Sequence, residues 1–159
     1  MFTFFKKKKI ELYSPIHGVV LPIEEVPDPV FSKKMMGEGI AIEYLKGDVY
    51  APFDGVISSI LLPSAHAFGI TSEQGIEILV HIGLETVNLK AGVFKPLKKQ
   101  GDRVKQGEKI LQIDEASLKN NQSVLISPVV VLKADNYKLN IVREKGQIIS
   151  EKDVLLSFE

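Results

Sequence analysis

In Gly75-Ile76-Glu77-Ile78-Leu79-Val80-His81-Ile82-Gly83-Leu84-Glu85-Thr86-Val87, the first half has the pattern of a β-strand. Ile76, Ile78 and Val80 recur at every second position, which is the period that a pleated strand imposes. His81 therefore lies on the opposite face of the strand. Gly83 ends the run, and because it has no side chain the backbone can bend close to the imidazole. The stretch predicts a strand that ends at a reactive histidine.

A second histidine lies upstream, in the run Ser64-Ala65-His66-Ala67-Phe68-Gly69-Ile70. Residues 71–75 are typical of a turn, so the runs on either side are predicted to pair antiparallel. His66 and His81 are roughly equidistant from this turn, and the pairing places them across from each other. Alone, either would be interpreted as a hydrogen-bonded structural residue. Since the chain has only three histidines, a facing pair predicts a shared site.

The composition limits the possible functions. A chain of 159 residues is long enough for one domain with a sizeable core. It has no apolar run long enough to cross a membrane. The 20 basic residues balance the 20 acidic ones, so no net field favours nucleic acid or a membrane surface. The absence of cysteine excludes disulfides and is expected of a cytoplasmic protein.

Residues 1–10 are predicted to be a basic tail, and residues 11–159 a single domain. The tail begins with the short apolar segment Met1–Phe5, and Lys6–Lys9 follow it. This order is the reverse of that in a signal peptide, and the apolar part is too short for one. We interpret the tail as solvated, with a weak contact to anionic lipid as the alternative.

Repeated segments and frequent turns predict an all-β fold. Residues 13–20 recur as residues 50–57, residues 127–131 are a weaker third copy, and residues 101–111 resemble residues 146–156. Short strands between Gly, Pro and Asp turns favour an antiparallel β-sandwich or barrel with internal duplication. Residues 114–120 are the only helix predicted, with Asp114 as its cap. Residues 27–29 are interpreted as a stiff loop.

The block around His81 resembles the signature of the glucose-type enzyme IIA domain of the bacterial sugar phosphotransferase system. His66-Ala67-Phe68-Gly69-Ile70 matches the second histidine of that family, and residues 26–31 and 37–42 match two further blocks. The similarity extends from about residue 11 to the C-terminus. It implies a hybrid-barrel fold in which the Nε2 atom of His81 is phosphorylated by the phosphocarrier protein HPr. The phosphoryl group then passes to a cysteine on a sugar-specific enzyme IIB.

The resemblance also implies roles for neighbouring residues. His66 would donate a hydrogen bond to the phosphoryl group, and the hydroxyl group of Ser64, where the family usually has threonine, would orient a ring. No metal or cofactor is required, because the reaction depends on positioning and electrostatics, although the resemblance also implies that zinc could bind weakly between His66 and His81. We expect a monomer that meets its partners through an apolar ring with an acidic rim. The apolar ring is predicted to contain Val30, Phe31, Leu62, Phe68 and Leu79, and the rim Asp28 and Glu85; Phe68 could instead belong to the core.

Three other functions are compatible with the sequence. His66, His81 and Glu85 could form a zinc site of a hydrolase, although the chain has no compact ligand motif. Lys34-Met35 is the nearest match to the modified lysine of a biotinyl or lipoyl carrier. A pure interaction module is the third possibility. Stoichiometric metal with catalytic turnover would identify a hydrolase, intact mass would identify a biotinyl or lipoyl carrier, and a radiolabel transfer assay distinguishes an interaction module.

Overall fold

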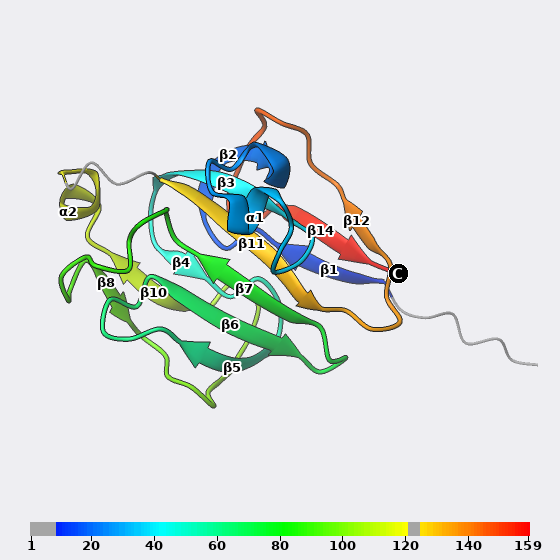
Figure 1. Cartoon of the computed structure of the whole chain (residues 1–159). Helices are drawn as coiled ribbons and strands as arrows, with labels where there is room; N and C mark the ends of the chain where they lie inside the picture. The colour runs from blue at the N-terminus through cyan, green and yellow to red at the C-terminus, as the bar shows by residue number, and fades with distance from the viewer. Residues whose placement is uncertain (1–8, 121–124) are drawn as a thin grey trace, which may run out of the picture.

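The computed structural model describes residues 9–120 and 125–159 and consists mainly of antiparallel β-strands (Figure 1). The predicted tail lies outside the described residues up to position 8, and the first strand begins at Ile10. The described strands form one sheet of eight and two of three. The large sheet contains, in spatial order, β13 (Ile148–Ile149), β2 (His17–Pro22), β3 (Gly39–Lys46), β11 (Ile126–Lys133), β7 (Glu77–His81), β6 (Ala67–Ser72), β5 (Gly55–Ile60) and β9 (Arg103–Val104).

The two smaller sheets pack with the large one as a sandwich. One contains β1 (Ile10–Tyr13), β14 (Val154–Phe158) and β12 (Leu139–Ile141), and the other β4 (Val49–Tyr50), β10 (Lys109–Ile113) and β8 (Phe94–Pro96). Among the described residues, β13 and β9 form the edges of the large sheet and do not pair with each other. The sequence was compatible with either a sandwich or a barrel, and the described strands do not close into a barrel.

The predicted duplication is present as two equivalent pairs of strands. In the first copy, Ile149 of β13 lies opposite Gly18 of β2, and in the second, Val104 of β9 lies opposite Gly55 of β5. The offsets between the copies are those of the sequence repeats, 55 − 18 = 37 and 149 − 104 = 45. Repeated sequence therefore produces repeated pairing.

Reciprocal hydrogen bonds join the two copies. The backbone N–H of Tyr13 donates to the carbonyl of Pro52, and that of Tyr50 donates to the carbonyl of Pro15, both over 2.8 Å. Tyr13 and Tyr50, like Pro15 and Pro52, occupy the same positions in their repeats. Such an exchange is expected of two copies related by an approximate two-fold axis.

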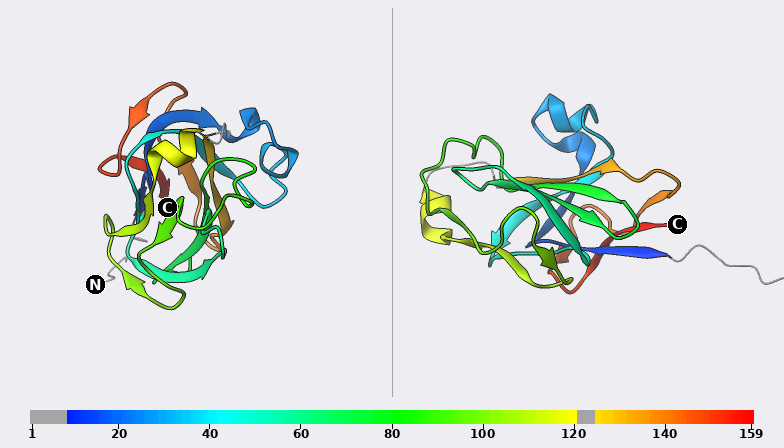
Figure 2. Two further views of the ribbon diagram at one scale, coloured as in Figure 1. Left: turned by 90° about the vertical axis from the view of Figure 1, so that its left-hand side faces the viewer. Right: turned by 90° about the horizontal axis from the view of Figure 1, so that it is seen from below.

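Two apolar clusters lie on opposite faces of the large sheet. The main core contains Ile78 and Val80 of β7, as the alternation in this strand predicts. A second cluster lies on the other face, beneath a short helical segment that projects from the sheet (Figure 2). This second cluster contains Ile23, Val26, Phe31, Ala41, Ala67, Leu79, Leu84 and Val130.

The helices are short, and the sequence pattern predicted only one of them. The helix α2 (Glu115–Asn120) is confirmed: Asp114 accepts hydrogen bonds from the backbone N–H and the hydroxyl group of Ser117, at 3.2 and 2.7 Å. The projecting segment contains the 3-10 helix η1 (Ile23–Glu25) and the helix α1 (Pro29–Ser32). The interpretation of residues 27–29 as a loop was therefore wrong at Pro29. Asp28 caps α1 and Pro29 begins it, which is a recognised start signal.

Candidate functional site

His81 is the last residue of β7, and its ring is held by the backbone that follows. Its Nδ1 atom lies 2.7 Å from the carbonyl oxygen of Gly83. Gly83 has a φ of 71°, and this left-handed conformation turns the chain back toward the ring. Because a carbonyl oxygen can only accept, Nδ1 carries the proton in this bond, and Nε2 keeps its lone pair.

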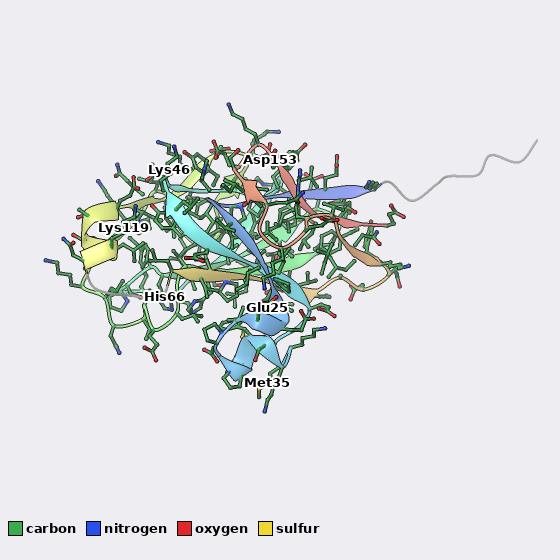
Figure 3. The ribbon with its side chains drawn as sticks, turned by 90° about the horizontal axis from the view of Figure 1, so that it is seen from above. Glu25, Met35, Lys46, His66, Lys119 and Asp153 are labelled. Atoms are coloured by element: carbon green, nitrogen blue, oxygen red, sulfur yellow. The ribbon has the colours of Figure 1, made fainter. Side chains whose placement is uncertain are left out.

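His66 lies directly before β6 and packs against His81. The ring centroids are 4.8 Å apart, and the planes meet edge to face at 78°. The antiparallel pairing of the two strands is as predicted, but the register differs by one residue, since Ala67 lies opposite His81. The carbonyl of His66 instead accepts the backbone N–H of Ile82 at 2.7 Å. Figure 3 shows His66 toward the same side of the molecule as Met35, which follows α1.

Ser64 contacts the ring of His66 as the sequence analysis expected. Its Oγ atom lies 2.6 Å from the Nδ1 atom of His66, and both side chains are buried. A hydroxyl group can donate or accept in such a bond. When it donates to Nδ1, the proton of the neutral imidazole is on Nε2, and that atom can then donate to a ligand.

Burial keeps both imidazoles neutral at pH 7. It lowers the pKa of His66 to about 4, with a further contribution from the neighbouring His81. Burial also lowers the pKa of His81, while the bond to Gly83 and the charge of Asp28 act in the opposite direction. A neutral ring with a free Nε2 lone pair is the form of histidine that attacks an electrophile.

The lowered pKa of His66 predicts acid sensitivity. The unfolded chain binds a proton at His66 below pH 6.5, whereas the folded chain does so only near pH 4. The contribution of neutral His66 to the free energy of unfolding is therefore complete above pH 6.5 and is lost as the pH falls toward 4. We expect the free energy of unfolding to decrease by about 2 kcal/mol between pH 7 and pH 5 from this group. Urea titrations of the wild type and of His66→Gln at several pH values measure this change. If the free energy of unfolding changed equally with pH in both proteins, the prediction would be contradicted.

The residues of the predicted apolar ring differ in burial. The ring of Phe31 meets that of His81 edge to face at a centroid distance of 5.3 Å, and Leu79 belongs to the same cluster as Phe31. Val30 and Leu62 are exposed, with 40% and 69% of their surface accessible. Phe31 therefore packs on the ring of His81 and Leu79 shares its cluster, whereas Val30 and Leu62 are accessible apolar side chains.

Phe68 is a correction to the predicted ring. It lies opposite Val80, on the inner face of β6, and is completely buried in the main core. In a strand successive side chains point to opposite faces, so Phe68 points away from the face of Ala67. It supports the strand and cannot contact a partner at the histidines.

The two acidic residues of the predicted rim have different environments. Asp28 is half-buried, and its Oδ1 atom accepts the backbone N–H of Val30 at 3.0 Å. It acts on His81 through charge. Glu85 is exposed on the turn after β7, where its φ of 58° is left-handed.

Sequence reasoning missed two buried hydroxyl groups that hold the turn after His81. The hydroxyl group of Thr86 donates to the carbonyl of Ile82 at 2.6 Å. That of Ser127 accepts the backbone N–H of Gly83 at 2.9 Å. Thr86 is part of the quoted block, and its side chain bonds four residues back. Ser127 is 44 positions from Gly83, and no local pattern connects them.

The alternative sites find no support. Among residues 9–120 and 125–159, no three His, Asp or Glu side chains gather in a way that could hold a metal ion. Lys34, the candidate for a carrier lysine, forms ion pairs with Glu24 at 2.8 Å and Glu38 at 3.0 Å.

No helix in the described part of the chain is long and apolar enough to span a membrane.

Comparison with known proteins identifies the family. Residues 10–137 match the family described as phosphoenolpyruvate-dependent sugar phosphotransferase system, EIIA 1. The chain is 38% identical over 154 residues to the glucose-specific EIIA component of Buchnera aphidicola, covering 97% of this chain and 94% of the relative. It is 41% identical over 145 residues to the glucose-specific EIICBA component of Staphylococcus carnosus, covering 91% of this chain and 21% of the relative.

A solved structure agrees with this assignment. Glucose permease IIA from Mycoplasma capricolum has a TM-score of 0.87 and 32% identity, with 98% of this chain and 99% of that chain covered. The fold and the relatives define a phosphotransferase component of a sugar-uptake system. The chain belongs to the EIIA 1 family of the phosphoenolpyruvate-dependent sugar phosphotransferase system, in which it acts as a phosphoryl carrier.

Proposed function

We propose that His81 is the phosphoryl acceptor. The observation that carries this proposal is the bond from Nδ1 of His81 to Gly83, because it leaves the Nε2 lone pair free beside a second imidazole. Nε2 attacks the phosphorus of phospho-HPr, and the bond from phosphorus to its donor atom breaks. In the second step a cysteine thiolate of enzyme IIB attacks phosphorus, and the bond to Nε2 breaks. His81 then regains its lone pair.

His66 and Ser64 act on the transferred group together. Ser64 donates its hydroxyl proton to Nδ1 of His66, which fixes the proton of the neutral ring on Nε2. That N–H then donates to a phosphoryl oxygen, and a preorganised donor of this kind stabilises charge that develops during transfer. The phosphoryl dianion also favours the protonated form of His66, since an adjacent opposite charge raises the pKa of an imidazole.

Ser64→Ala is expected to leave acceptance from phospho-HPr intact and to slow transfer to enzyme IIB by about tenfold, less than the loss of a donor that contacts phosphate directly. The reason is that the ring of His66 stays in place, while its tautomer is no longer fixed. Single-turnover transfer from phospho-HPr and to enzyme IIB measures the effect, and Ser64→Thr, which keeps the hydroxyl group, is the matched control. If Ser64→Ala transferred phosphate at the wild-type rates, Ser64 would have no role in the site.

The partners are proposed from the surface around the histidines. Val30, Phe31, Leu62 and Leu79 would exclude water around the phosphohistidine, and such exclusion protects a labile phosphoryl group. Asp28 and Glu85 would meet basic residues of HPr and enzyme IIB.

We further infer that the sugar is of the glucose type, as the names of the relatives suggest. The carrier is proposed to act in the cytoplasm as a monomer, with residues 11–159 as its single domain. Incubation with phosphoenolpyruvate, enzyme I and HPr, followed by mapping of the acid-labile phosphate, tests the central proposal. Phosphate on a residue other than His81 would overturn it.

A further inference from the structure

The buried hydroxyl group of Ser127 bonds Gly83, the residue whose carbonyl accepts the hydrogen bond of the His81 ring. Ser127 is at the start of β11, the strand that pairs with β7, and its side chain is completely buried. Its Oγ atom accepts the backbone N–H of Gly83 at 2.9 Å and donates to the carbonyl of Leu125 at 3.1 Å. With both bonds made, the hydroxyl group has one defined orientation.

Gly83 needs such an anchor more than other residues would. It has no side chain, and glycine has the largest range of backbone conformations. Its carbonyl oxygen nevertheless has to lie 2.7 Å from Nδ1 of His81. The bond to Ser127 ties the N–H of the same residue to β11. The position of the carbonyl is thus fixed by the neighbouring strand and not by the turn alone.

We propose that Ser127 is a positioning residue for phosphoryl transfer, acting on His81 through Gly83; this rests on the proposed role of His81. The Gly83 carbonyl keeps the proton of the neutral ring on Nδ1, and so keeps the Nε2 lone pair available. As the bond from Nε2 to phosphorus forms, the ring becomes positively polarised. A carbonyl dipole at the Nδ1 proton stabilises this charge only when it is held in line.

The test compares Ser127→Ala with Ser127→Thr and Ser14→Ala. Ser14 is the matched control, because it is also fully buried and bonds a carbonyl and an N–H, both of Ile16. The first readout is ¹⁵N NMR of the His81 ring at neutral pH without phosphate, which reports the tautomer. The second is the single-turnover rate of phosphate acceptance. A thermal melt shows that each variant is folded.

We expect Ser127→Ala to shift His81 toward the tautomer protonated on Nε2 and to slow acceptance by about 10- to 100-fold, the range for groups that orient a ligating histidine. Ser127→Thr should keep the wild-type tautomer and most of the rate, and Ser14→Ala should change neither. A Ser127→Ala protein with the wild-type tautomer would overturn the inference, whatever its rate or melting temperature. If the wild type itself accepts no phosphate on His81, the proposed function fails, while the tautomer comparison still tests Ser127.

Discussion

His81→Ala is expected to take up no measurable phosphate from phospho-HPr. The variant lacks the Nε2 atom of His81, which is the proposed nucleophile, so no covalent intermediate can form. Removal of a nucleophile commonly lowers a rate by about 10⁴-fold or more. Radiolabelled phosphoenolpyruvate with enzyme I and HPr measures the uptake, and the acid lability of the label identifies a phosphohistidine.

The matched control for this experiment is His17→Ala, because His17 is the third histidine and lies at the start of β2, away from the site. This variant should accept phosphate at the wild-type rate. Circular dichroism of both variants verifies that the sheets are intact. Label on His66 or His17 of the wild type would contradict the assignment, as would residual uptake by His81→Ala.

His66→Gln is expected to separate the two halves of the reaction. Acceptance from HPr should persist, because His81 keeps its lone pair and its bond to Gly83. Transfer to enzyme IIB should decrease by about 10²- to 10³-fold, or roughly 3–4 kcal/mol, the usual effect of losing a preorganised donor in a transition state. Glutamine can offer an N–H but cannot become charged beside the phosphoryl group.

Paired single-turnover experiments measure this division, first from phospho-HPr to the protein and then from the phosphorylated protein to enzyme IIB. His17→Gln carries the same substitution outside the site and should leave both rates unchanged. If His66→Gln abolishes acceptance as completely as His81→Ala, then His66 takes part in forming the nucleophile. If both steps are unaffected, His66 is a structural histidine of the strand.

Local patterns in the sequence determined the secondary structure that carries the site. The alternation through Ile76, Ile78 and Val80 predicted β7 and its two faces, since this depends only on the pleat. The same alternation, counted from His66, wrongly placed Phe68 on the site face, because the register sets Ala67 opposite His81 and Phe68 in the core. The helix α1, which was not predicted, could also have been predicted from the sequence, because Asp28 and Pro29 form a local start signal.

By itself, the sequence determined that strands pair in a duplicated, antiparallel arrangement and that the segments of His66 and His81 are neighbours. Repeats, turns and alternation are local properties, and each can be seen within a few residues. Only the tertiary structure decided the register that sets Ala67 opposite His81, and the contact of Ser127 with Gly83. A register depends on how many residues the turn uses, and a contact across 44 positions depends on which strand becomes the neighbour. Both follow from the packing of the whole sheet, because a buried face admits one pairing among several that the local pattern allows.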